Sequence, residues 1–142
     1  MKKIEIEKQN IIIRQYDPSE NMDEIITELI EFIEENNLTI TGHLFARNYK
    51  ENNEIKYEFG IPIEEYINGN DEIKVLTIPE HTAISTLHKG PYNRIIETVD
   101  KLSNYLNENN LKLTDAPIYI YQNSPKEVAE DELITEVQYP IS

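Results

Sequence analysis

Two glutamates, Glu58 and Glu136, occupy matching positions in two similar segments of the chain, and aromatic residues are expected close to both. Ring faces attract cations, and a partly desolvated carboxylate prefers a positive partner. Such a combination suits a flat or bulky lipophilic cation. The sequence therefore predicts a ligand-binding site lined by six side chains, namely Phe45, Glu58, Tyr92, Tyr119, Tyr121 and Glu136.

The same side chains could also support acid–base chemistry. Glu136 could activate a water molecule while Tyr92 or Tyr119 donates a proton, provided that the carboxylate is desolvated. Spacing along predicted strands does not establish hydrogen-bond geometry, so binding without turnover is the favoured interpretation and no catalytic residue is assigned.

Each of these residues also has a plain structural interpretation. Tyrosines on a sheet surface often form cross-strand pairs that cover their neighbours. The two glutamates could be ordinary solvent-facing strand residues. A third alternative is that Arg47 neutralises one of them, which would weaken the argument for a cation.

The glutamates lie in the segments 54–63 and 132–141, which share an opening glutamate, an aliphatic second residue, a glutamate at the fifth position and a closing Pro-Ile. Apolar and polar residues alternate in both, as in strands with one covered face. Glu58 is predicted to point to the other face of its strand from Phe59 and Ile61. In the same way, Glu136 is predicted to point to the other face from Val137, and Gln138 is predicted on the same face as Glu136.

Two helices are predicted, over residues 22–36 and 91–109, each with one apolar stripe. The stripes consist of Ile26, Leu29, Ile30 and Ile33 in the first helix, and Ile95, Val99, Leu102 and Leu106 in the second. Both helices end in the same sequence, Glu-Asn-Asn-Leu, at residues 35–38 and 108–111.

These repeats predict an α+β fold, a pseudo-twofold duplication of a strand-helix-strand-strand unit. We expect one domain over residues 1–142, with halves 1–66 and 71–142 joined by the segment 66–71. The two halves would form an antiparallel sheet with both helices on one face and a ligand groove on the other.

Alternation along the strands assigns residues to the predicted groove. In the strand 117–122, Ile118 and Ile120 are expected to meet the helix, which would turn Tyr119 and Tyr121 toward the groove. In the first half, Leu44 and Ala46 are expected to be buried, so that His43, Phe45 and Arg47 face outward.

Composition excludes several kinds of site. The absence of cysteine rules out zinc ribbons, iron–sulfur clusters and thiol nucleophiles. The three histidines have no ligand spacing, so neither a metal nor another cofactor is predicted. The 27 acidic and 13 basic residues give a formal charge of -14, which opposes direct binding to nucleic acid or to an anionic membrane. No secretion signal or membrane span is apparent, which favours a cytoplasmic protein.

Several motifs resemble the GyrI-like small-molecule-binding domains. These motifs are His88-Lys89-Gly90-Pro91-Tyr92 before a long helix, Tyr121-x-Asn123-x-Pro125, Glu132-Leu133-Ile134-Thr135-Glu136 with Pro140-Ile141, and Glu58-Phe59-Gly60-Ile61-Pro62-Ile63. Such domains occur as effector-binding parts of AraC-type and MerR-type regulators and as standalone proteins, including a gyrase inhibitor. The resemblance implies two fused units and a hydrophobic central cleft that binds drug-like, often cationic, compounds.

The chain departs from this family at Tyr119, where many members carry a cleft glutamate. Under the resemblance, the charge would have to come from Glu136 or Glu58. Both predicted helices are needed to cover the sheet, so no DNA-binding helix-turn-helix is expected. The predicted function is a standalone small-molecule-binding protein that senses or sequesters lipophilic compounds, cations among them. The alternatives are a hydrolase of electrophilic small molecules that uses a cleft glutamate and tyrosine, and a regulator that binds a protein target such as gyrase.

Overall fold

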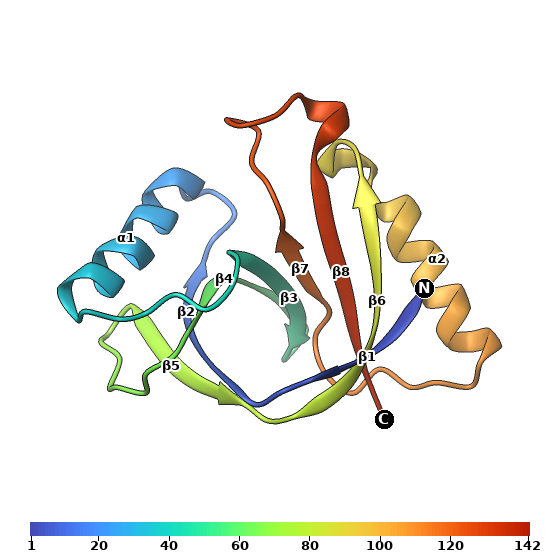
Figure 1. Cartoon of the computed structure of the whole chain (residues 1–142), viewed down its shortest axis with the longest axis horizontal. Coiled ribbons are helices and arrows are strands. Elements are labelled where there is room, and N and C mark those ends of the chain that lie inside the picture. The colour runs from blue at the N-terminus through green and yellow to red at the C-terminus, as the bar shows by residue number, and fades with distance from the viewer. The chain divides into compact units, whose positions relative to one another are not determined.

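The computed structural model describes residues 1–142 and has the predicted α+β composition, with antiparallel strand pairs and two α-helices (Figure 1). The chain divides into two compact units. Unit 1 contains residues 1–6 and 81–142, and unit 2 contains residues 7–80. Each unit contributes four strands and one α-helix, so the predicted duplication is confirmed at the level of architecture.

Unit 2 is built from β2, α1, β3, β4 and β5, and its strands lie in the order β3-β4-β2-β5. The bounds are β2 (Gln9–Tyr16), α1 (Met22–Glu35), β3 (Phe45–Glu51), β4 (Glu54–Ile63) and β5 (Ile73–Ile78). Arg14 on β2 donates hydrogen bonds to Glu28 on α1, so the side chains on the same side of β2 face the helix. Phe59 lies opposite Arg14 in the β2–β4 register, which places it on this helix-covered face as predicted.

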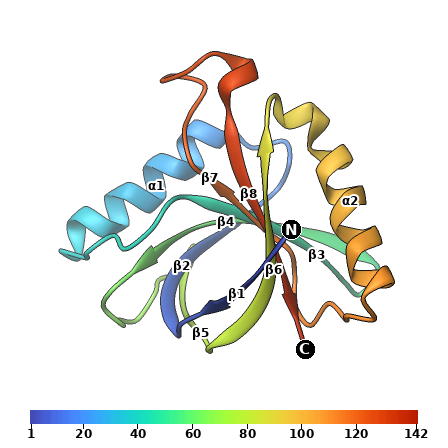
Figure 2. The ribbon, with the colours of Figure 1, turned by 45° about the vertical axis from the view of Figure 1, so that its right-hand side comes forward.

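Unit 1 has the strand order β1-β6-β8-β7, and α2 runs alongside β6 (Figure 2). The bounds are β1 (Lys2–Ile6), β6 (His81–Lys89), the 3-10 turn η1 (Tyr92–Arg94), α2 (Ile95–Glu108), β7 (Ile118–Tyr121), the 3-10 turn η2 (Glu130–Glu132) and β8 (Ile134–Ile141). Apolar side chains from β6, β8 and α2 form one core cluster, made of Ile84, Leu102, Leu106, Val137, Tyr139 and Ile141.

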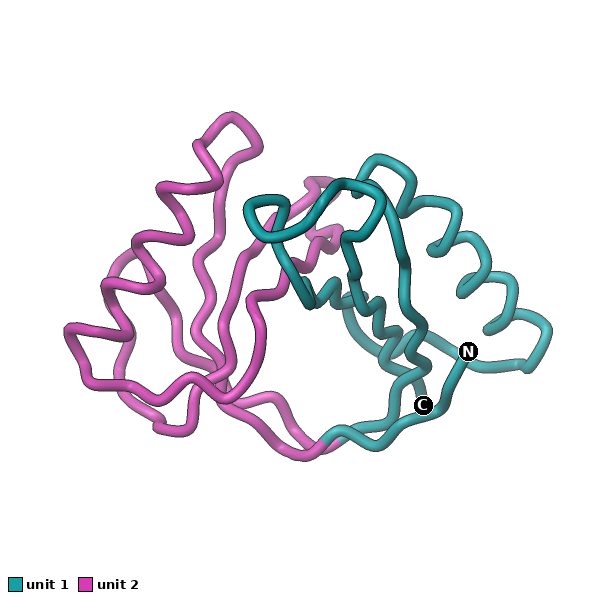
Figure 3. The backbone as a smooth tube through the Cα atoms, turned by 45° about the horizontal axis from the view of Figure 1, so that its top comes forward, with its two compact units in different colours: residues 1–6, 81–142 teal, residues 7–80 magenta.

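The units exchange their outer strands relative to the predicted halves. β1 pairs with β6, and β5 pairs with β2, so the chain crosses between units at residues 6–7 and 80–81 (Figure 3). The segment 66–71 therefore connects β4 to β5 inside unit 2. The predicted halves, 1–66 and 71–142, differ from the units for this reason: strand partners far apart in the chain cannot be read from local alternation.

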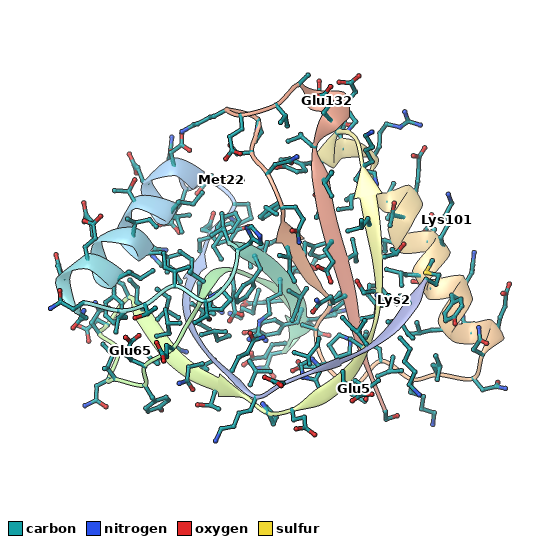
Figure 4. All side chains as sticks on the ribbon, viewed as in Figure 1. Lys2, Glu5, Met22, Glu65, Lys101 and Glu132 are labelled. Atoms are coloured by element: carbon teal, nitrogen blue, oxygen red, sulfur yellow. The ribbon has the colours of Figure 1, made fainter.

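The two helices follow the predictions closely. Met22 begins α1, and the exposed Lys101 lies on α2 (Figure 4). The α2 stripe faces the core as predicted, although α2 itself begins only after the 3-10 turn. The buried stripe of α1 is rotated from the prediction and consists of Ile25, Leu29, Phe32 and Ile33. Neither helix has the length and hydrophobicity needed to cross a membrane.

Both helices end with the same backbone cap. Asn37 and Asn110 adopt left-handed conformations, with φ of 53° and 55°. In each case the N–H of the following leucine, Leu38 or Leu111, donates to a carbonyl five residues earlier at 2.9 Å. Asparagine is one of the few residues other than glycine that tolerates this geometry at a helix end. The repeated Glu-Asn-Asn-Leu sequence thus encodes a repeated structural cap.

Candidate functional site

Glu58 on β4 is buried and ion-paired inside unit 2. Its cross-strand partner on β3 is Arg47, whose Nε donates to Glu58 Oε1 at 2.7 Å. The Tyr49 hydroxyl donates to the other carboxylate oxygen at 3.1 Å. Burial, followed by the charge of Glu58, raises the pKa of Tyr49 above its ordinary value. The alternative that Arg47 neutralises one of the two glutamates is therefore confirmed for Glu58.

Phe45 lies on the same face of unit 2 as Glu58, as alternation predicted. Its cross-strand partner is Gly60, and a Cβ atom added at Gly60 would overlap the Phe45 ring. The ring thus lies directly over the glycine and is itself buried. This close approach explains why a residue without a side chain occupies that position in β4.

Glu136 on β8 has a different environment. Its Oε2 accepts hydrogen bonds from Ser85 Oγ at 2.8 Å and from Gln138 Nε2 at 2.7 Å, and its Oε1 accepts one from Gln122 Nε2 at 3.2 Å. All three donors are neutral. Glu136 takes part in none of the salt bridges of the chain, so its negative charge is solvated by dipoles but is not cancelled.

The strands on both sides of Glu136 present apolar side chains to it. Leu87 on β6 and Ile120 on β7 lie directly opposite Glu136 in their registers. Leu87 is 63% exposed, so most of its apolar side chain is in contact with water. Sequence reasoning missed Leu87, and it also missed the three hydrogen-bond donors, although Gln138 was correctly placed on the side of Glu136.

The predicted orientation of β7 is wrong. Tyr119 lies opposite Val137 and packs against the α2 core cluster, whereas Ile118 and Ile120 share the face of Glu136. Tyr119 and Glu136 are therefore on opposite faces of the unit 1 sheet. The four residues of β7 alternate isoleucine and tyrosine, both of which can be buried, so the pattern does not show which pair meets the helix.

Tyr121 and Tyr92 also lie away from Glu136. Tyr121 is opposite Thr135 in the register and so faces the same side as Tyr119. Tyr92 stands in the turn before α2, and its ring packs edge-on against Tyr121 with centroids 5.4 Å apart. Burial raises the pKa of both Tyr92 and Tyr119. The glutamate and tyrosine proposed for acid–base chemistry are not brought together on one face of this unit.

His88, in the motif that precedes α2, has a structural role. One ring nitrogen, Nδ1, lies 2.8 Å from Thr98 Oγ1, and the other, Nε2, lies 3.0 Å from the Pro91 carbonyl oxygen. The buried ring thereby ties the end of β6 to the first turn of α2. Nowhere in the chain do three His, Asp or Glu side chains come together in a way that could hold a metal ion.

The sequence profile of the GyrI-like small molecule binding domain matches residues 4–142. The chain therefore belongs to this family of small-molecule-binding domains. No curated protein sequence matches it.

Solved structures share the fold. EcmrR in a DNA complex superposes with a TM-score of 0.84 at 24% identity, covering 99% of this chain and 56% of that chain, so this chain spans about half of EcmrR. The EcmrR C-terminal domain alone gives 0.79 at 23% identity, with coverage of 99% and 96%. A hydrolase from Listeria innocua gives 0.74 at 12% identity, with coverage of 99% and 91%. SAV2435 bound to tetraphenylphosphonium gives 0.64 at 10% identity, with coverage of 99% and 93%.

Proposed function

We propose that this protein binds lipophilic cations of drug-like size on the sheet face of unit 1 that carries Glu136, and that it acts by sensing or sequestering them. One observation carries the proposal. Glu136 is a carboxylate with three neutral hydrogen-bond donors and no cationic partner, set between the apolar side chains of Leu87 and Ile120.

Neutral hydrogen-bond donors orient a carboxylate but bring no net positive charge to it. A bound cation would supply the missing positive charge, and its apolar groups would cover Leu87, which is otherwise largely exposed to water. Two of the solved structures support this assignment. SAV2435 is bound to a lipophilic cation, tetraphenylphosphonium, and the C-terminal domain of EcmrR has the same fold as this chain.

Binding without turnover is the form of the function that the geometry favours. A hydrolase built on Glu136 would need a proton donor on the same sheet face, and Tyr119 lies on the other one. A hydrolase from Listeria innocua has a similar fold, but similarity of fold does not place a proton donor beside Glu136 in this chain.

The test is a comparison of tetraphenylphosphonium with tetraphenylborate, an anion of the same shape, as ligands of the wild-type protein. The chain has nine tyrosines and no tryptophan, so quenching of tyrosine fluorescence reports binding, and calorimetry provides affinity and stoichiometry. We expect the cation to bind more tightly. A charge pair about 6 Å apart at an effective dielectric of about 20 gains roughly 3 kcal/mol, which partial solvent exposure reduces to about 1–2 kcal/mol.

Glu136→Gln should therefore weaken the binding of tetraphenylphosphonium about 10-fold, since about 1.4 kcal/mol corresponds to a factor of ten. Glu132→Gln is the matched control, because it makes the same charge change at an exposed position in unit 1 (Figure 4). Equal affinity of Glu136→Gln and the wild type for the cation would contradict the proposal, as would equal affinity of the wild type for both ions.

A further inference from the structure

The two units present the same strand arrangement around their glutamates but carry different residues at the two positions that flank each glutamate. Glu58 on β4 lies opposite Arg47 on β3, and Glu136 on β8 lies opposite Ile120 on β7. On the other flank, Glu58 lies opposite Gln15 and Glu136 lies opposite Leu87. The two residues directly paired with the glutamate are therefore polar in unit 2 and apolar in unit 1.

In unit 2, Arg47 already makes the contacts that a cationic ligand would make. Its Nε is 2.7 Å from Glu58 Oε1, and its guanidinium carbon lies 6.0 Å from the centroid of the Tyr49 ring. Carboxylate and aromatic ring are the two partners that attract an organic cation. The side chains of Arg47 and Glu58 are only 11% and 4% exposed, so an incoming cation would have to break a buried ion pair and take the place of Arg47.

In unit 1, the equivalent position cannot supply a charge. Ile120 has no donor, and the Glu136 carboxylate is held instead by a hydroxyl and two amide groups. These donors orient the carboxylate and leave its charge in place. The difference between an arginine and an isoleucine at one strand position therefore determines whether the charge of each glutamate is cancelled internally.

We infer that Ile120 is the residue that determines cation specificity in this protein, and that Arg47 closes the equivalent face of unit 2. The chain then has one cation site rather than two, although its fold is duplicated. This inference rests on the proposed function, because it assigns the residue that leaves the Glu136 site open.

The test uses Ile120→Arg with Ile120→Met as the matched control, since methionine approximates the length of the arginine stem without its charge. Wild type should bind one tetraphenylphosphonium per chain. Ile120→Arg should weaken that binding at least 10-fold and abolish the preference over tetraphenylborate, because the new arginine would pair with Glu136 as Arg47 does with Glu58. Ile120→Met should stay within about threefold of wild type.

The outcomes separate the two proposals. If the wild type does not prefer the cation, the proposed function fails. If the wild type prefers the cation and Glu136→Gln weakens it, but folded Ile120→Arg binds it as tightly as Ile120→Met, only the present inference is overturned. Circular dichroism establishes that each variant is folded.

Arg47→Met provides a second, independent test, which also decides the case if Ile120→Arg does not fold. Removing the internal cation should open the face of unit 2 and raise the number of tetraphenylphosphonium ions bound per chain from one to two, as measured by calorimetry. A stoichiometry that stays at one in folded Arg47→Met would show that Arg47 does not close that face.

Discussion

The ion pair between Arg47 and Glu58 makes a strong prediction about stability. Arg47→Met removes the charge and the 2.7 Å hydrogen bond and leaves the carboxylate of Glu58, whose side chain is 4% exposed, without a cation. Removing one partner of a buried pair costs about 3–5 kcal/mol. Tyr49 still donates one hydrogen bond to Glu58, so we expect the lower end, about 3 kcal/mol.

Urea unfolding followed by circular dichroism measures this loss. With a slope of about 2 kcal/mol per molar urea, the midpoint of Arg47→Met should fall by about 1.5 M relative to wild type. The experiment is done without ligand, because a cation that binds the opened face would stabilise the folded protein.

The double variant Arg47→Met/Glu58→Gln is the control. It removes both charges, and replacing both members of a buried pair is often nearly neutral, so it should regain most of the lost stability. The reasoning would be refuted if Arg47→Met lowered the midpoint by less than about 0.5 M, or if the double variant were no more stable than the single one.

Two further predictions concern the helix caps and the half-buried Tyr119. Asn37→Ala and Asn110→Ala should each lower the free energy of unfolding by about 1 kcal/mol, because alanine is strained at φ of 53° and 55°. Glycine at either position should cost little. Equal losses of stability with alanine and glycine, measured by urea unfolding, would contradict this. Burial, followed by the charge of Tyr139, raises the pKa of Tyr119 above 10.0, so the folded state retains the Tyr119 proton more strongly than the unfolded state does. The stability that this provides is complete below pH 10.0 and is lost as the pH rises through the folded pKa. Phenolate absorbance should accordingly show one fewer late-titrating tyrosine in Tyr119→Phe than in wild type, and a single transition for all tyrosines of the wild type would argue against its burial.

Local patterns in the sequence predicted much of the fold. The helix α1 was placed to within one residue at its end, and the repeated Glu-Asn-Asn-Leu sequences correspond to two equal caps. The opposite faces of Glu136 and Val137 were also predicted correctly, because successive side chains of a strand point to opposite faces and the apolar set that contains Val137 is the one that packs against α2.

The orientation of β7 could not be predicted in the same way. A period of two shows that Tyr119 and Tyr121 share a face, but it does not show which face that is when isoleucine and tyrosine are both able to pack in a core. The pairing of Tyr119 with Val137 places Tyr119 on the helix-covered face, and this contact joins residues that lie 18 positions apart in the sequence. For this reason Tyr119 and Tyr121, which were predicted to line the site with Glu136, lie on the other face of the strand.

The sequence by itself determined that the chain is duplicated, where its helices lie and which strand residues share a side, since all of these follow from short-range periodicity and capping. Only the tertiary structure decided that β1 and β5 exchange units, that Arg47 cancels Glu58, and that Glu136 stands between Leu87 and Ile120. These facts depend on which strands are neighbours and in what register they pair. Contacts between segments far apart in the chain decide both, and the spacing of residues along one strand does not encode them.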